Sequence, residues 1–276
     1  MQIPEKDSIA DQPTEAPNKP FAPPRILAPV WHTVMLIVGI LALSISGSSR
    51  LAGMHGSGSR LTTYATTALL EVVMLGWVAL GLWLRKIPLR TLFGAVAGGF
   101  RGFALDLGIA VLFWIGSLMI LGTLGILWSS VEAALTHQQP AGRSGQPFAP
   151  SPSQQRTVRE LEQLAPANGE EIAAWVALCI LVGFVEESVF RGYLQSQFIA
   201  WAGGGAAVGV VLSALLFGAA HGYQGVRNMA LLAVFGVLFG LLAIFRRSLR
   251  PCMFAHCWQD IVAGLALGFL RSHHFV

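Results

Sequence analysis

Ionisable residues interrupt three apolar stretches in the C-terminal half of this sequence. The first interruption holds two adjacent acids and an arginine, the second a histidine, and the third a histidine and an acid: Glu186, Glu187, Arg191, His221, His256 and Asp260. An ionisable side chain within lipid is costly and is by default a functional-site hypothesis. Carboxylates and imidazoles at a dehydrated site can take up and release protons. These residue types therefore indicate general acid–base chemistry inside a membrane.

The spacing of the first group predicts different roles for its two acids, Glu186 and Glu187. Glu187 and Arg191 stand four residues apart with the acid first, the better orientation for an ion pair within one helix. That pairing gives Glu187 a supporting role. Glu186 is offset by about 100° around the helix and stays available as a base. Two acids facing water at a helix end would be the non-catalytic alternative.

The histidines have to reach the same depth as Glu186. Glu186 and His221 stand at nearly equal distances from a turn near Gly203, each about 26 Å along its helix, so they can share one depth. His256 and Asp260 are four residues apart and share a helix face, where the acid can orient the imidazole. His256 lies only about 12 Å from a turn near Ser248, so its arrival at the site requires a tilt, a kink or a re-entrant segment.

The composition indicates a membrane protein. The chain is 54% hydrophobic and only 12% charged, whereas a soluble domain has about 25% charged residues. The net charge of +4 comes mostly from arginines in short connections, which favours a role in membrane topology over nucleic-acid binding. Cys179, Cys252 and Cys257 form no CxxC pair and are interpreted as small hydrophobic residues of the bundle.

Seven apolar runs predict an all-α, polytopic transmembrane helix bundle of about seven helices, with six to eight as the range. The runs are Val30–Ile45, Tyr64–Leu84, Phe103–Trp128, Ile172–Phe190, Ala206–Ala220, Met229–Phe245 and Cys252–Leu270. The last three contain or adjoin small-xxx-small pairs, which allow helices to approach closely in lipid. These pairs are Gly205/Gly209, Gly236/Gly240 and Gly264/Gly268.

Changes in composition divide the chain into four parts. Residues 1–25 form a polar tail that we expect to be disordered, and residues 26–130 a three-helix membrane segment. Residues 131–170 form a polar linker, in which Thr157–Leu164 has the pattern of a short interfacial helix. Residues 171–276 form a four-helix core that carries the candidate chemistry. Glu71 and Asp106 have no comparable polar neighbours in the sequence, which favours interior packing or interface placement for both.

Basic residues predict how the chain crosses the membrane. They gather in the connections after the second and sixth runs, which an alternating topology places on one side: Arg85, Lys86, Arg90, Arg101, Arg246, Arg247 and Arg250. By the positive-inside rule that side and the N-terminus are cytoplasmic, and the C-terminus is outside. Arg50 and Arg60 oppose this orientation. We expect an integral, multi-pass protein of a bacterial inner membrane.

Three motifs in the C-terminal half resemble those of a known family. Glu186-Glu187-Ser188-Val189-Phe190-Arg191 resembles the E-E-x-x-x-R motif of the CAAX-protease and bacteriocin-processing (CPBP, or Abi) intramembrane proteases. Phe217 to His221 is similar to its F-x-x-x-H motif, and His256 to Asp260 to its H-x-x-x-N/D motif. The resemblance covers roughly residues 170–270. Ser188 replaces a bulkier apolar residue, and Asp260 stands where asparagine is common.

The resemblance implies a role for each matched residue. Glu186 would activate the attacking water, with His221 holding that water or sharing its proton. His256 and Asp260 would stabilise the oxyanion, and Glu187 with Arg191 would brace the first motif. The family has been described both as metal-dependent and as metal-free, so zinc or another divalent metal on Glu186, His221 and His256 is compatible with the resemblance.

The expected activity is an intramembrane endopeptidase that hydrolyses a peptide bond in a membrane-embedded or lipidated substrate. Some family members remove the last three residues from prenylated C-termini, whereas others act in peptide maturation or immunity. The expected partners are this substrate and the lipid bilayer, without nucleic acid. A non-catalytic scaffold or bacteriocin-immunity-type protein that uses the polar clusters structurally is the alternative. A transporter ranks third because no internal repeat is visible.

Overall fold

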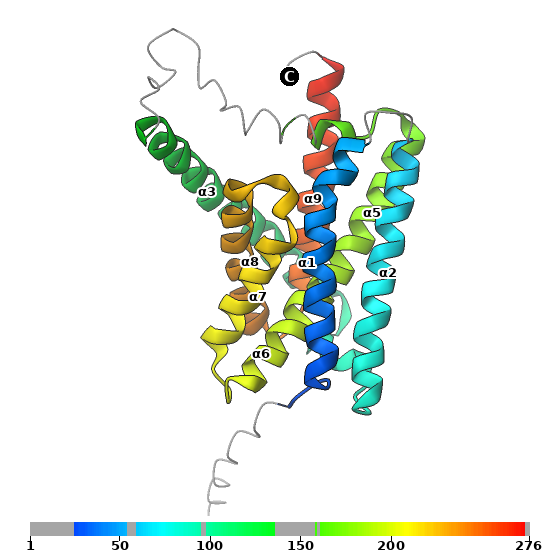
Figure 1. Cartoon of the computed structure of the whole chain (residues 1–276), viewed down its shortest axis with the longest axis vertical. Helices are drawn as coiled ribbons and strands as arrows, with labels where there is room; N and C mark the ends of the chain where they lie inside the picture. Colours follow the sequence, from blue (N-terminus) through cyan, green and yellow to red (C-terminus); the bar gives the residue numbers. More distant parts are fainter. Residues whose placement is uncertain (1–24, 54–58, 95–97, 136–157, 159–160, 274–276) are drawn as a thin grey trace, which may run out of the picture.

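The structure is a computed structural model, which describes residues 25–53, 59–94, 98–135, 158 and 161–273. Every extended regular element in these ranges is a helix, and Gly94 and Ser248 form an isolated bridge. Five helices are long and apolar enough to cross a membrane, and two further apolar helices are shorter. The seven apolar runs of the sequence correspond to these helices, which confirms the all-α, polytopic bundle (Figure 1).

The elements follow one another with short connections wherever the chain is described. In chain order they are α1 (Val30–Gly53), α2 (Arg60–Leu84), η1 (Leu89–Phe93), α3 (Gly99–Leu135), α5 (Gly169–Glu186), η3 (Glu187–Leu194), α6 (Gln195–Trp201), α7 (Ala206–Ala220), η4 (Gly222–Gln224), α8 (Val226–Arg246) and α9 (Arg250–Ser272). Elements η1 and η4 are 3₁₀-helices and η3 is a π-helix. Helix α3 is longer than the predicted Phe103–Trp128. The helix predicted to end at Phe190 instead continues from α5 through η3 into α6 without a break.

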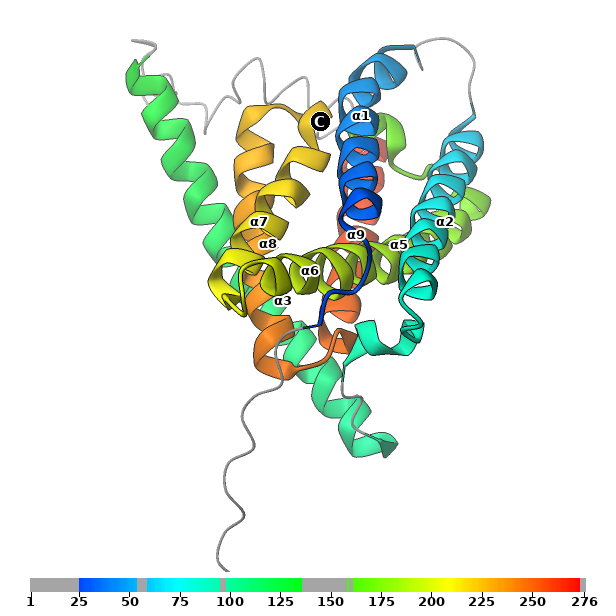
Figure 2. The same cartoon turned by 60° about the horizontal axis from the view of Figure 1, so that its bottom comes forward.

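The two basic connections meet at one end of the bundle, as the topology argument predicted. The connection between α2 and α3 touches the one between α8 and α9 through the Gly94–Ser248 bridge, and the amide of Leu249 donates to the carbonyl of Phe93 at 3.1 Å. Helix α1 begins at the same end, whereas α9 finishes at the other (Figures 1 and 2). Which end faces the cytoplasm stays a prediction.

Asp106 has partners that the sequence did not suggest. Its carboxylate is buried in α3 and pairs with Arg246 at 2.9 Å and with Arg250 at 2.6 Å. Asp106 is buried, as interior packing predicted, but the sequence did not reveal these two partners. Both arginines come from the basic connection more than a hundred residues later, and a contact over that separation leaves no local pattern in the sequence. The three-residue cluster joins α3 to α8 and α9.

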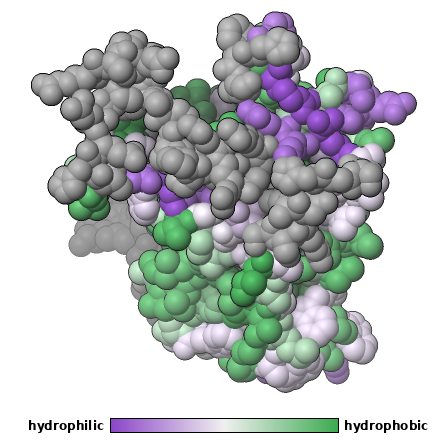
Figure 3. Space-filling view, turned by 45° about the horizontal axis from the view of Figure 1, so that its top comes forward, coloured by the Kyte–Doolittle hydropathy of each residue, from purple (hydrophilic) through white to green (hydrophobic). Residues whose placement is uncertain are grey.

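The outer surface of the bundle is apolar. Helix α3 buries Ala110, Ser117 and Gly125 but exposes Leu112, Met119 and most of its other large side chains. Figure 3 shows hydrophobic side chains over the flank of the molecule and hydrophilic ones gathered toward one end. In water such a surface would be unfavourable, whereas in a bilayer it faces lipid.

Buried polar side chains attach α1 and α2 to the C-terminal half. The hydroxyl of Tyr193 in η3 lies 2.8 Å from Thr33 Oγ1 and 3.1 Å from His32 Nδ1. His32 Nε2 lies 2.9 Å from the carbonyl of Trp77, and because a carbonyl only accepts, Nε2 is the protonated nitrogen. Gln197 in α6 accepts from the amide of Leu27 at 2.8 Å. These bonds hold α1 and α2 in place against η3 and α6.

Glycines permit close contacts between the last helices. A Cβ on Gly236 would lie 2.9 Å from the Cα of Ala214, so α8 and α7 touch along their backbones there. A Cβ on Gly264 would overlap the indole ring of Trp175, which brings α9 against α5. Two of the small-xxx-small pairs thus provide members of the close helix contacts that they predicted.

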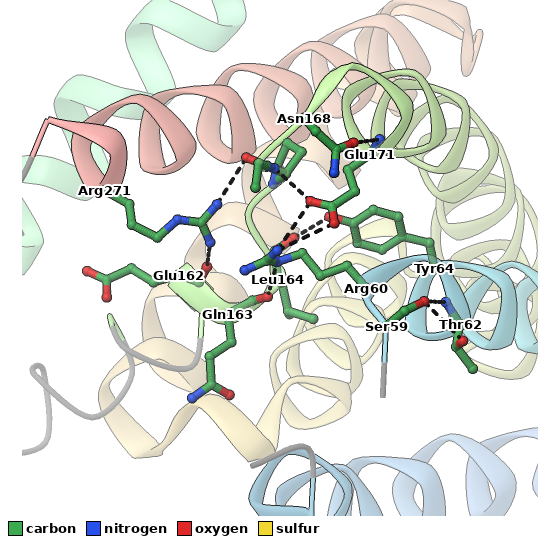
Figure 4. Close-up of polar contacts among 12 residues, drawn as sticks. Ser59, Arg60, Thr62, Tyr64, Glu162, Gln163, Leu164, Asn168, Glu171 and Arg271 are labelled. Atoms are coloured by element: carbon green, nitrogen blue, oxygen red, sulfur yellow. Dashed lines mark hydrogen bonds and ion pairs between the residues drawn. The ribbon is translucent and has the colours of Figure 1, made fainter. Parts of the chain in front are cut away.

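A polar cluster ties α2, α5 and α9 together at the end opposite the basic connections (Figure 4). Arg60 pairs with Glu171 at 3.3 Å, and the Tyr64 hydroxyl donates to the carbonyl of Leu164. Arg271 donates to the carbonyl of Glu162 at 2.8 Å. The ion pair explains how Arg60 is accommodated at the end that the positive-inside rule disfavours. Of the predicted interfacial helix, residues 158 and 161–164 are helical and the remainder lies outside the described residues.

Candidate active site

The first motif lies where the regular α-helix changes into a π-helix. Helix α5 ends at Glu186, and Glu187 begins the eight-residue π-helix η3, in which every residue is buried. Stretches of π-helix are rare and occur frequently at functional sites. The wider turn changes which way the side chains of this motif point, and a sequence pattern read with α-helical periodicity does not reveal it.

Glu187 accepts two hydrogen bonds at one carboxylate oxygen. Arg191 Nη1 lies 2.9 Å from Glu187 Oε1, so the expected ion pair within the helix is present. His256 Nδ1 lies 2.8 Å from the same oxygen. Since a carboxylate paired with an arginine is an acceptor, His256 carries its proton on Nδ1. The Arg191 guanidinium also lies over the ring of Phe217, with Cζ 4.2 Å from the centroid.

The other nitrogen of His256 faces two more acids. His256 Nε2 lies 3.6 Å from Glu186 Oε2 and 3.6 Å from Asp260 Oδ2. Glu186 Oε2 is buried and has no hydrogen-bond partner. The structure thus brings Glu186, Glu187, His256 and Asp260 together around one imidazole, as their motifs suggested. Only one oxygen of this group, on Glu187, is fixed by protein donors from two helices.

A glycine makes this meeting of α5 and α9 possible. Gly183 stands three residues before Glu186, and a Cβ there would lie 2.9 Å from the backbone nitrogen of Cys257. Cys257 follows His256 directly in α9. The two helix backbones therefore touch at the level of the site, which brings His256 beside Glu186.

His221 approaches the same region from the end of α7. It is the C-cap residue of that helix, and its Nδ1 lies 2.9 Å from the carbonyl of Phe217, which leaves Nε2 for other partners. The Phe217 ring packs near both histidines, with its centroid 4.9 Å from that of His221 and 6.2 Å from that of His256. His221 also interacts electrostatically with Asp260. This hydrogen bond joins residues four apart, which is the spacing of Phe217 and His221 in the second motif.

Tyr223 is a neighbour of the site that sequence reasoning missed. It lies in η4, two residues after His221, and burial raises the pKa of its hydroxyl to about 12. The negative charges of Glu186 and Asp260 also raise this pKa, and the Tyr223 ring lies 6.1 Å from that of His221 between centroids. A lone tyrosine in a short connection gives no signal of this placement.

Glu71 is the second missed neighbour. The sequence favoured interior packing for this residue, but its carboxyl group interacts electrostatically with Glu186, His256 and Asp260. Glu71 is 8% exposed, and its Oε2 is buried without a hydrogen-bond partner. The predicted interior packing is confirmed, but the sequence did not reveal these neighbours in space. The neighbours belong to helices more than a hundred residues away.

The described side chains do not form a preassembled metal site. Protein zinc sites use three or four His, Cys, Asp or Glu ligands. Within the described ranges, no group of three or more such side chains is placed so that it could hold a metal ion. Glu186, His221 and His256, the set compatible with a metal by resemblance, do not form such a group as placed.

Comparison with known proteins finds a family match in the C-terminal half. Residues 168–262 match the family model of the Rce1-like, type II CAAX prenyl endopeptidases. Searches of curated proteins and of solved structures return no match. The matched segment runs from the N-cap of α5 into α9 and contains all six motif residues, whereas Glu71 lies outside it. The resemblance predicted from the three motifs is confirmed: residues 168–262 are similar to the Rce1-like family of type II CAAX prenyl endopeptidases.

Proposed function

We propose that this protein is an intramembrane endopeptidase that hydrolyses a peptide bond with Glu186 as the base. The observation that carries this proposal is the unpartnered, buried Oε2 of Glu186, 3.6 Å from a histidine nitrogen. A buried carboxylate oxygen without a partner is unfavourable in a purely structural role. The same oxygen is suited to accept a hydrogen bond, and then a proton, from a water molecule.

The hydrolysis can be written with the side chains of this site. Glu186 takes one proton from water while the water oxygen bonds to the carbonyl carbon, and the carbonyl oxygen becomes an oxyanion. His256, oriented by Glu187, presents Nε2 with its proton to that oxyanion when the imidazole is charged. When the carbon–nitrogen bond breaks, the proton held by Glu186 passes to the leaving amine. His221 Nε2 would share this proton transfer, and Asp260 would stabilise the charged imidazole.

The Glu187–Arg191 pair acts through His256 in this proposal. Arg191 is 3% exposed and holds Glu187 by one hydrogen bond, and Glu187 in turn holds the imidazole by another. Second partners of this kind fix which nitrogen of a histidine carries the proton. The pair therefore positions His256 Nε2 without contacting the substrate.

We propose a membrane-associated, prenylated peptide as the substrate. The family name supports this chemistry. The apolar outer surface also suits a substrate that arrives from the lipid phase, where a prenyl chain would partition. The bacterial inner membrane expected from the sequence stays a prediction.

Cleavage of a farnesylated peptide tests the function. The full chain would be reconstituted in phospholipid vesicles with a synthetic peptide ending in farnesyl-cysteine and three further residues. Mass spectrometry is expected to show loss of these three residues, and no loss from the same peptide without the farnesyl group. Equal cleavage of both peptides would refute the prenylated substrate. No cleavage of either, by protein shown to be folded, would refute the proposed function and favour the scaffold alternative.

A further inference from the structure

Glu71 is a buried acid whose position no packing requirement explains. It belongs to the buried stripe of α2, where Tyr64, Glu71 and Val78 recur every seven residues. Residues at this spacing lie on one helix face. The flanking members, Tyr64 and Val78, have an aromatic and an aliphatic side chain, and burial of such groups at this position carries no free-energy penalty. An ionisable group there is expensive and needs a reason.

The polar cluster at the end of the bundle fixes how far α2 reaches along α5. Arg60, in the first turn of α2, pairs with Glu171, in the first turn of α5. The Tyr64 ring lies 5.5 Å from that of Trp175 between centroids. The two helices thus start together and run in the same direction (Figures 1 and 4). Glu71 follows Tyr64 by about two turns, or roughly 10 Å, which carries its carboxyl group toward the site.

The charged groups that act on Glu71 belong to the site. Its carboxyl group interacts electrostatically with Glu186 of α5 and with His256 and Asp260 of α9. Tyr223 in η4 interacts electrostatically with Glu71 and also with Glu186. The Oε2 atoms of Glu71 and Glu186 are both buried without a hydrogen-bond partner. Glu187 Oε2 is in the same state, but its Oε1 already accepts from Arg191 and His256. An ordered water, with two O–H groups, is the simplest donor that can serve both Glu71 and Glu186.

We propose that Glu71 is a further catalytic residue, which holds the attacking water together with Glu186. One O–H of the water points to Glu186, which removes that proton as the water oxygen bonds to the carbonyl carbon. The other O–H points to Glu71 and keeps its proton, so the new carboxylic acid group of the product carries it away. Glu71 thereby fixes the direction of the attacking lone pair. This role rests on the proposed peptidase function and extends the site beyond residues 168–262 to α2.

Replacement of Glu71 by leucine separates this role from a structural one. Glu71→Leu removes both the acceptor and an unsatisfied buried group, so the protein should melt at the same or a higher temperature. The kcat for the farnesylated peptide should fall by at least about tenfold, because a misplaced reactant costs up to roughly 10²-fold, while KM changes little. Glu71→Gln keeps one acceptor oxygen and should retain more activity than Glu71→Leu. The matched control is Val78→Ala on the same stripe, which should lower the melting temperature and leave the kcat of the folded fraction unchanged.

The outcomes distinguish this inference from the proposed function. If Glu186→Gln is inactive and Glu71→Leu keeps a kcat close to that of the original protein, the role of Glu71 is refuted and the peptidase stands. If Glu186→Gln cleaves normally, the proposed mechanism fails as a whole. A high-resolution structure in lipid gives a test without substrate. A water within about 3.2 Å of both carboxyl groups supports the inference, and a Glu71 carboxyl bonded to a protein donor instead overturns it.

Discussion

His256 Nδ1 lies 2.8 Å from Glu187 Oε1, and this hydrogen bond joins the π-helix of the first motif to the helix of the third. The bond determines which nitrogen of His256 faces the rest of the site. Because Glu187 is itself paired with Arg191, the position of the His256 side chain also depends on this buried ion pair. In His256, Nδ1 therefore holds the ring in place, and Nε2 is the nitrogen that takes part in the proposed reaction.

A substitution of His256 by asparagine exploits this separation. The asparagine Nδ2 can replace Nδ1 as the donor to Glu187, but nothing replaces Nε2. We expect His256→Asn to keep nearly the melting temperature of the original protein, whereas kcat falls by about 10²-fold or more, the typical cost of losing one group that stabilises an oxyanion. Thermal melts in detergent and initial rates with the farnesylated peptide measure both. A His256→Asn protein with unchanged kcat would show that Nε2 takes no part in the reaction.

Removal of one partner of the buried pair should cost more than removal of both. Glu187→Leu leaves the nearly inaccessible Arg191 guanidinium without its acid, and such a loss typically costs about 3–5 kcal/mol. In Glu187→Leu/Arg191→Met the stranded charge is gone, so the double variant should be the more stable of the two. Chemical denaturation in detergent would measure the difference. Equal destabilisation by the single and double changes would contradict the pair as described.

The contact between α5 and α9 at Gly183 should be intolerant of a side chain. A methyl group there would lie 3.3 Å from the Cα of Cys257 and closer still to its nitrogen and sulfur. We expect Gly183→Ala to push α9 away from Glu186 and to lower both the melting temperature and kcat. The control is Gly108→Ala in α3, where a Cβ meets nothing within 4 Å. Matching rates for the two variants would mean that the helices adjust without disturbing the site.

In the proposed mechanism Glu186 supplies the base and His256 the donor to the oxyanion, so no step of it depends on a metal ion. We expect cleavage to continue after incubation with a strong chelator and removal of the chelated ions. Elemental analysis of the purified protein should show less than stoichiometric zinc. Loss of activity on chelation, with recovery on addition of zinc, would contradict this expectation.

Local sequence patterns predicted the helices and the six motif residues, but not the contacts between distant helices. The apolar runs and the four-residue spacings of Glu187 with Arg191 and of His256 with Asp260 are short-range features, and the structure contains them. The placement of Glu71, Asp106 and Tyr223 depends on which helices pack together, which no single segment specifies. The π-helix was likewise hidden, because its residues follow an ordinary apolar run.

The rate of cleavage by Glu186→Gln protein tests the central claim most directly. The change replaces one carboxylate oxygen by an amide and leaves the side-chain shape almost unaltered. Glu170→Gln, the same change at an exposed position in the first turn of α5, serves as the control. With both proteins folded in vesicles, the account predicts that Glu170→Gln cleaves the farnesylated peptide normally and that Glu186→Gln loses at least about 10²-fold in kcat. Normal cleavage by Glu186→Gln would contradict the account.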